Sequence, residues 1–360
     1  MKKPASIVLL TLLLSSGFAQ KPEDPLKNNS DLKAASQVIP DKTDRNNNFY
    51  DNEETYSLPV KELIIAGEIE NPGKVDFSKL VKRSVIVKEA LLKQDTANQF
   101  VGAYRYDGYS LFDILCDRRL KKKNAADFRP IIDLFVEIEN DKGEKVVLSW
   151  GEIYYPNSLH NIIIATEVMR IVPSKTKDLW PLPAESKLIV GQDLISERNI
   201  SSPVKITIIS YRRNYMVNRD ISPLVSEKVD VFSGEAQTDS FSATPDKMQT
   251  ETLHTIFYGK GRGIHSTQPF SGVYLKDYLA GKIQFNRENL RKGLVICAGI
   301  DGYRSVYTFS EIMNRNDQAE VLLVPCPGEK DGGKFRIFPS CDFFSDRAVK
   351  ALSEIRFERR

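Results

Sequence analysis

Apolar and polar positions follow short patterns that change along the chain. Alternation with a period of two predicts β-strands, and apolar residues spaced three or four apart predict helices. Because the two patterns do not alternate regularly, the sequence predicts an α+β fold with mixed sheets. Strands are expected at residues 63–67, 134–138, 145–148, 204–210, 253–258 and 321–324, a hairpin at 294–309, and helices at 84–93, 111–115 and 273–279.

Three segments of the chain recur later in the same order. Residues 141–153 align without a gap on 300–312, and residues 193–198 align on 342–347. A third pair is weaker and lies upstream, at 106–115 and 270–279. A repeat this long is too large for a solenoid unit. The sequence therefore predicts two tandem domains of one fold, at residues 58–211 and 212–360.

The first 57 residues differ in composition from the rest. Met1–Lys3 is basic, residues 7–14 are apolar, and small residues precede Ala19. This order is typical of a secretory signal peptide (residues 1–19), and it predicts export to the periplasm. The apolar run is too short to span a bilayer, so no membrane insertion is expected. Residues 20–57 are polar and predict a flexible tether.

Composition excludes several functional classes. The 360 residues include 51 basic and 48 acidic ones, for a net charge of +3, which gives no electrostatic basis for binding nucleic acid. His160, His254 and His265 are too scattered for a zinc motif, and the Ser, His and Asp spacings indicate no hydrolase. We expect no metal site from these residues.

A family resemblance rests on an ordered set of segments in the second copy. The set comprises Gly272-Val-Tyr-Leu-Lys-Asp-Tyr-Leu279, Asp301-Gly-Tyr303, Phe309-Ser-Glu-Ile312, Val324-Pro325, Phe338-Pro339, Asp342 and Arg347. This order resembles the molybdopterin-binding domain of the sulfite oxidase family over about 110 residues, and the first copy resembles it more loosely.

The resemblance implies two diverged domains of sulfite oxidase-type fold with mixed sheets, whose loops cradle a molybdenum pterin. Enzymes of that family ligate the metal with a cysteine thiolate placed before the Gly-Val-x-Leu helix. The cysteines of this chain, Cys116, Cys297, Cys326 and Cys341, all follow the corresponding helix start. No cofactor is therefore expected, and molybdopterin is the one that the resemblance would imply.

The most site-like stretch is Gly259-Lys-Gly-Arg-Gly263, followed by His265. Glycines that turn backbone N–H groups toward one point, together with Lys260 and Arg262, are the parts of an anion-binding nest. The alternative is a flexible turn. Arg304 is expected as a neighbour of this cofactor-binding set.

Arg347 stands five residues after Asp342, as Arg198 does after Asp193. An arginine at this position could clamp a phosphate, which adds Arg347 to the cofactor-binding candidates. The favoured alternative is structural, with each Asp–Arg pair fixing a loop, because both copies keep the pair.

The cysteines allow one disulfide. In an oxidising compartment Cys326 and Cys341 are expected to be bridged across a hairpin, while Cys116 and Cys297 are expected to be buried free thiols. A metal pair formed by Cys326 and Cys341 with His265 is the rival interpretation.

Three function classes follow from these observations. The leading hypothesis is an exported binding or accessory protein, whose partner is a small anionic ligand or a periplasmic protein. The alternative is a periplasmic molybdopterin-dependent oxidoreductase with an atypical metal site, so enzymatic activity depends on a retained cofactor. A structural protein that docks partners is the third.

Overall fold

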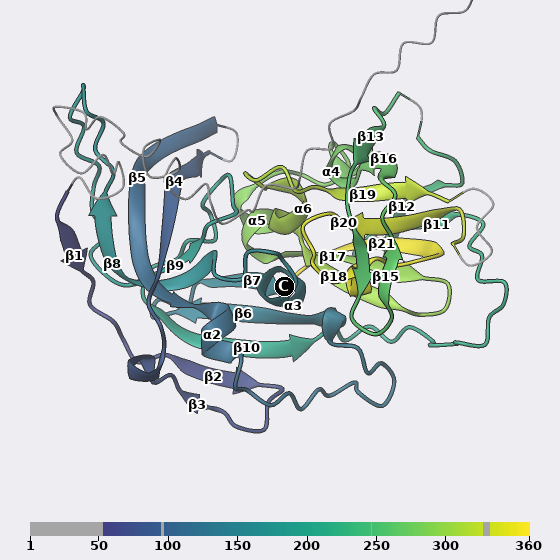
Figure 1. The fold of residues 1–360 in the computed structure, drawn as a ribbon, viewed down its shortest axis with the longest axis horizontal. Helices are drawn as coiled ribbons and strands as arrows, with labels where there is room; N and C mark the ends of the chain where they lie inside the picture. Colours follow the sequence, from purple (N-terminus) through teal and green to yellow (C-terminus); the bar gives the residue numbers. More distant parts are fainter. Residues whose placement is uncertain (1–52, 95–96, 246, 327–331) are drawn as a thin grey trace, which may run out of the picture. The chain divides into compact units, whose positions relative to one another are not determined.

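The computed structural model describes residues 53–94, 97–245, 247–326 and 332–360. The predicted signal peptide and most of the predicted tether lie outside them. The described chain is mainly β, with four mixed or antiparallel sheets of four or five strands, a two-stranded sheet, and helices of only five or six residues. The four larger sheets are arranged like the blades of a four-bladed β-propeller (Figure 1). The mixed sheets were predicted, but the helical share of an α+β fold was overestimated.

Two sheets make up the first half of the chain. One has the strand order β3-β2-β10-β6-β7, and the other has the order β1-β8-β5-β4 with β9 paired to β8. The elements are β1 (Thr55–Ser57), β2 (Ile64–Gly67), β3 (Gly73–Lys74), η1 (Phe77–Lys79), β4 (Arg83–Lys93), β5 (Ala97–Ser110), α2 (Leu111–Leu115), η2 (Ile131–Asp133), β6 (Leu134–Asn140), β7 (Lys145–Ser149), α3 (Trp150–Tyr154), β8 (Ile162–Arg170), β9 (Lys187–Val190) and β10 (Pro203–Ser210).

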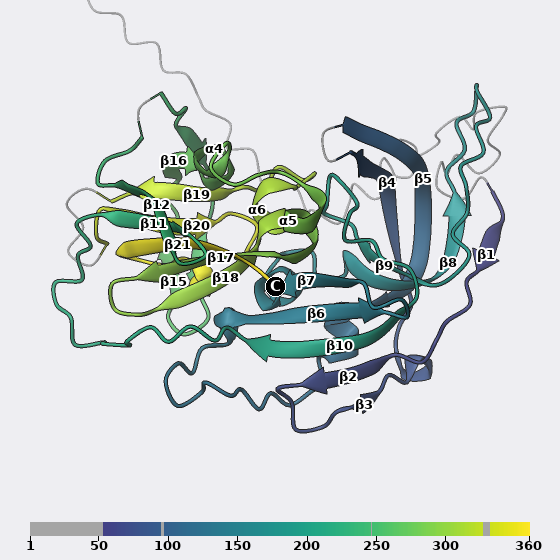
Figure 2. The same ribbon diagram turned by 180° about the vertical axis from the view of Figure 1, so that it is seen from behind.

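The second half contains the sheets β12-β11-β21-β17-β18 and β13-β16-β19-β20, and the small sheet β14-β15. The view from behind shows β11, β21, β17 and β18 side by side (Figure 2). The elements are β11 (Val229–Ser233), β12 (Ala236–Phe241), β13 (Glu251–Leu253), β14 (Phe257–Gly259), β15 (Gly263–Ser266), β16 (Phe270–Tyr274), α4 (Leu275–Leu279), α5 (Arg287–Lys292), β17 (Gly293–Gly299), β18 (Arg304–Thr308), α6 (Phe309–Met313), β19 (Val321–Pro325), β20 (Phe335–Pro339), η3 (Ser345–Arg347) and β21 (Leu352–Arg359).

The two halves share one topology. In the sheets β3-β2-β10-β6-β7 and β12-β11-β21-β17-β18 the central strand, β10 or β21, pairs in parallel with β2 or β11 and antiparallel with β6 or β17. In each of the other two sheets, β5-β8-β9 corresponds to β16-β19-β20. The described residues of both halves nevertheless belong to one compact unit, and the predicted boundary between residues 211 and 212 lies inside it.

Local sequence signals explain the equivalent helices α3 and α6. Ser149 and Thr308 each cap the backbone N–H of a glutamate three residues later, and that glutamate bonds back to the cap. This capping box satisfies two backbone donors at the start of a helix. It therefore begins a helix at the same place in both halves. None of the described helices is long and apolar enough to cross a membrane.

Two predicted elements are corrected by the structure. Residues 84–93 belong to strand β4, where Val85 and Glu89 face inward and Ile86 and Lys88 face solvent. The period of two and eleven backbone pairings with β5 outweigh the helical spacing of the apolar residues. At the end of the predicted tether, Thr55–Ser57 forms β1 against β8.

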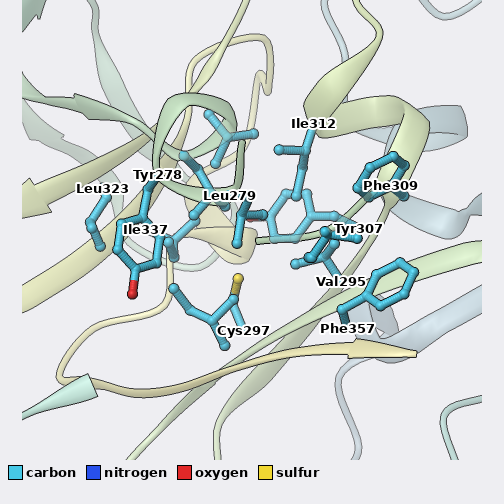
Figure 3. Packing of buried hydrophobic residues seen from close by; sticks show 14 of the residues in the cluster. Tyr278, Leu279, Val295, Cys297, Tyr307, Phe309, Ile312, Leu323, Ile337 and Phe357 are labelled. Atoms are coloured by element: carbon cyan, nitrogen blue, oxygen red, sulfur yellow. The ribbon is translucent and has the colours of Figure 1, made fainter. Parts of the chain in front are cut away.

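The largest apolar core lies in the second half. It is formed by side chains from β17, β18, β19, β20 and the helices α4 and α6, including Cys297, Tyr307 and Phe309 (Figure 3). Leu92, at the end of β4, belongs to the same core. The long β4–β5 hairpin of the first half therefore packs into the second half.

Candidate functional site

The glycine-rich segment forms the turn of the β14–β15 hairpin. Backbone pairing of Gly259 with Gly263 leaves Lys260 and Arg262 exposed in the connecting turn. The segment thus joins two strands and does not lead into a helix. Its two cations stand on a surface hairpin that pairs with no other strand of the described chain.

His265, on β15, is an exposed residue of this hairpin. Its ring centroid is 5.3 Å from that of Phe257. A side chain at residue 259 would place its Cβ 2.4 Å from Nε2 of His265, so the ring would have to move if this residue were not glycine. Gly259 thus leaves room for the ring of His265 in its present position.

His265 borders a groove of about 540 Å³, which we call the groove. An adjoining cavity of about 250 Å³ shares Phe257, His265 and Lys350 with it. The walls come from the β14–β15 hairpin, β16 and the segment before it, the ends of β19 and β20, and the loop before β21. The lining residues are Phe257, His265, Ser266, Gln268, Pro269, Phe270, Ser271, Val324, Pro325, Arg336 and Lys350.

The charged residues described in the lining of the groove are all basic. Arg336 and Lys350 line it, whereas none of its described lining residues is an aspartate or a glutamate. Two cations in a concave wall raise the local concentration of anions. The adjoining cavity differs, because Asp301 and Asp346 line it. The preference for an anion therefore belongs to the groove.

Arg336, on β20, is held in place by its surroundings. It is 6% exposed, and its Nε donates to Sγ of Cys326 at 3.0 Å. Its guanidinium lies 5.8 Å from the ring centroid of Phe270, which stacks on Phe338 at 4.3 Å. The groove thus combines a fixed cation with an aromatic wall. Arg336 was not among the predicted site residues, although an arginine in the apolar strand Phe335–Pro339 is itself an unusual signal.

Arg304 does not lie in the groove. It is 1% exposed on β18, and its Nη2 is 3.2 Å from Oδ2 of Asp133 in the first half. Its guanidinium lies 4.2 Å from the ring centroid of Phe128 and 5.6 Å from that of Tyr215. The structure therefore places Arg304 at a contact between the halves, away from Lys260 and Arg262.

Arg347 is also fully buried. Its Nε and Nη2 donate to Asp342 at 2.7 and 2.6 Å, and Nη2 is 2.6 Å from Oε1 of Glu311. Nη1 donates to Oγ of Ser149 in the first half at 3.3 Å. A Cβ on Gly151 would lie 2.2 Å from Nη1, so glycine is needed for this approach. Arg347 is paired with buried protein groups and is not among the described lining residues of the groove.

Arg198 repeats this arrangement in the first half. It donates to Asp193 at 2.8 and 2.6 Å and to both oxygens of Glu152 at 2.9 Å. Its Nη1 also donates to Oγ1 of Thr308 in the second half at 3.1 Å. The Asp–Arg pairs thus have the structural role that was favoured from the sequence.

The two arrangements are joined through their cap hydroxyls. Oγ of Ser149 donates to Glu311 at 2.7 Å, and Oγ1 of Thr308 donates to Glu152 at 3.1 Å. Each half therefore supplies a hydroxyl to the carboxylate of the other. We call the whole set the seam network: Ser149, Glu152, Asp193, Arg198, Thr308, Glu311, Asp342 and Arg347.

Burial governs the titration of the seam carboxylates. Desolvation raises the pKa of Glu152, Asp193 and Asp342, against the opposing charges of Arg198 and Arg347. Burial also acts to raise the pKa of Glu311, but the charge of Arg347 and its hydrogen bonds outweigh it, so this pKa is lowered.

The groove does not fit the metal ligation of the resembled family. The family's thiolate would fall just before β16 and α4, where His265, Ser266, Gln268 and Phe270 line the groove without sulfur. No group of three or more His, Cys, Asp or Glu residues in the described chain could hold a metal ion. The donor set suits an anionic head group and offers no thiolate to molybdenum.

The predicted disulfide between Cys326 and Cys341 is corrected by the structure, in which all four cysteines are free. In the β19–β20 pairing Val321 faces Pro339 and Pro325 faces Phe335. Cys326 and Cys341 therefore lie at opposite ends of the hairpin, too far apart for a bridge. The same separation removes the rival metal pair. Cys297 is buried as expected, whereas Cys116 is exposed.

Comparison with known proteins adds no relative. No protein-family model matches the chain, and no curated protein matches its sequence.

Proposed function

We propose that the chain is an exported binding or accessory protein that holds a small anionic ligand in the groove of its second half. The observation that carries the proposal is that two cations, Arg336 and Lys350, line one groove together with an aromatic wall. Charge-assisted hydrogen bonds from such cations are among the stronger polar contacts in proteins. Lys260 and Arg262, on the hairpin that carries His265, steer the anion toward the groove.

We also propose that each half has the sulfite oxidase-type fold. The ordered segments of the second half and the shared strand order of the two halves support this. Binding is favoured over molybdopterin-dependent oxidation because residues 265–271 offer no thiolate where that family ligates its metal.

The test uses phenyl phosphate as a probe that combines an anion with a ring, and benzyl alcohol as its neutral counterpart. Calorimetry should show saturable binding of phenyl phosphate alone. Lys350→Met should weaken it about tenfold or more, the expected effect of losing one charge-assisted hydrogen bond. Lys334→Met is the matched control, because Lys334 is 43% exposed and pairs with Glu227 outside the groove lining.

Arg262→Ala separates the two parts of the proposal. If the turn contacts the ligand, this variant should also lose about tenfold in affinity, and if it only steers the anion, the loss should disappear at high salt. Equal binding of benzyl alcohol, or unchanged affinity in Lys350→Met, would refute anion binding in the groove.

A further inference from the structure

The two halves meet through equivalent backbone bonds on one side of the seam network. The N–H of Asn157 donates to the carbonyl of Cys341 at 3.2 Å, and the N–H of Asn316 donates to the carbonyl of Gln192 at 3.0 Å. In the repeat, Asn157 corresponds to Asn316 and Gln192 corresponds to Cys341. The halves are therefore related here by a local twofold axis.

A cavity of about 230 Å³ lies at this contact, and both halves line it. The first half contributes Glu152, Pro156, Asn157, Ser158, Leu159, Asn161, Ile162 and Gln192, and the second contributes Arg315, Asp317, Ala319, Ser340 and Cys341. The groove shares none of these residues. The cavity is thus a separate candidate site that neither half forms alone.

The side chains around the cavity do not follow the symmetry of the backbone. Gln192 stands where the second half has Cys341, and Ser158 stands where it has Asp317. The thiol and the amide offer very different hydrogen-bonding capacity. The cavity therefore has a distinct polar wall on the side of Gln192.

The side-chain amide oxygen of Gln192 accepts no hydrogen bond from the described residues of the protein at this wall. Its side chain is 7% exposed, and its Oε1 is buried without a hydrogen-bond partner. Leaving a buried acceptor unsatisfied costs free energy, so such atoms usually receive a bond from a ligand or an ordered water. The missing partner is a donor.

The charges around the cavity are already compensated within the protein. Arg315 donates to both oxygens of Asp317 at 2.8 and 2.6 Å, and its side chain is 3% exposed. Glu152 is held by both terminal nitrogens of Arg198 at 2.9 Å. Amides and hydroxyls from Asn157, Ser158, Asn161, Gln192 and Ser340 make up the rest of the polar lining, and no described lining residue is aromatic. The wall favours a neutral, flexible ligand over an ion or a flat ring.

We infer that this cavity binds a small neutral polyol of four or five carbons, with a hydroxyl donating to Oε1 of Gln192. An apolar cavity of about 150 Å³ holds benzene, so a cavity of about 230 Å³ suits roughly nine non-hydrogen atoms. Erythritol and xylitol bracket that size. Their hydroxyls both donate and accept, as the amide-rich wall requires.

The experiment measures binding of erythritol and xylitol to the full chain by saturation-transfer NMR, with succinate and putrescine as charged comparators. We expect saturable binding of the polyols alone. Gln192→Leu should weaken it about tenfold, because the acceptor is lost at nearly constant volume. Cys341→Ser, on the opposite wall, should bind as the natural protein does.

A second measurement needs no variant. Cys341 lines the cavity and Cys116 does not, so polyol should slow alkylation of Cys341 by iodoacetamide several-fold and leave Cys116 unchanged. If Gln192→Leu fails to fold, this protection of Cys341 still tests whether the polyol binds in the cavity. No saturable polyol binding would mean that water alone fills the cavity and would overturn the inference. Tighter binding of succinate or putrescine, or unchanged affinity in folded Gln192→Leu, would do the same.

Discussion

Arg347→Met is expected to lower the free energy of unfolding by about 3–5 kcal/mol, the usual cost of breaking a buried ion pair. The side chains of Arg347, Asp342 and Glu311 are all 0–1% exposed, so removing the guanidinium leaves two buried carboxylates without this cation. Methionine fills much of the space but leaves both carboxylates unpaired. A loss of this size is a large part of the stability of an ordinary domain.

Urea unfolding followed by tryptophan fluorescence measures the loss. Trp150, the first residue of α3, is 3% exposed and follows the cap residue Ser149 of the seam network. Arg213→Met is the matched control, because Arg213 and its partner Glu235 are 34% and 80% exposed. An exposed pair of this kind contributes at most about 1 kcal/mol.

The loss should also depend on pH. In Arg347→Met, burial without a cation raises the pKa of Glu311 and Asp342 above their unfolded values of about 4. A carboxyl with a raised folded pKa stabilises the fold below its unfolded pKa, and this contribution disappears as pH rises through the folded pKa. The deficit relative to the natural protein should therefore be smaller near pH 4 than at pH 8. A loss below about 1 kcal/mol at neutral pH, or a deficit that grows on acidification, would refute this account of the seam network.

Further predictions concern the thiols, the metal and Arg304. Denatured, unreduced protein should show four reactive thiols, and the folded protein should react first at Cys116, because Cys116 is exposed whereas Cys297, Cys326 and Cys341 are buried. Only two reactive thiols in the denatured sample would instead indicate that the protein contains a disulfide. Protein purified from its source should carry far less than one molybdenum per chain, as metal analysis would show, and a stoichiometric amount would favour the oxidoreductase alternative. Arg304→Met should lower the unfolding free energy by about 3 kcal/mol through its pair with Asp133 while leaving phenyl phosphate affinity unchanged.

The sequence predicted best what neighbouring residues determine. The hairpins β6–β7 and β17–β18 turn through Gly143 and Gly302, whose φ angles of +79° and +77° favour glycine. The pairing of Asp342 with Arg347 was recognisable because the arginine follows the aspartate by five positions in both halves. These features need only a short stretch of chain to specify them.

Features that depend on distant segments could not be predicted in this way. The groove brings His265 of β15 together with Arg336 of β20 and Lys350 of the following loop, and nothing in the sequence marks these residues as neighbours. The strand β4 was mistaken for a helix because its apolar residues fit both periods, and only pairing with β5 decides between them. Arg304 and Arg347 have the charge that an anionic ligand needs, but in the fold each is paired with a buried carboxylate.

The hydroxyls of Ser149 and Thr308 each bond to a carboxylate of the other half, so dividing the chain between the halves would separate these partners. A fragment ending near residue 211 would keep Arg198 with Asp193 and Glu152 but would lose the hydroxyl of Thr308. The complementary fragment would keep Arg347 and lose Ser149. In each fragment, polar groups of the seam network would lose their hydrogen-bond partners from the other half. Polar groups that stay buried without a partner destabilise the fold. The two pieces should therefore behave as a split protein, weakly folded apart and restored by mixing.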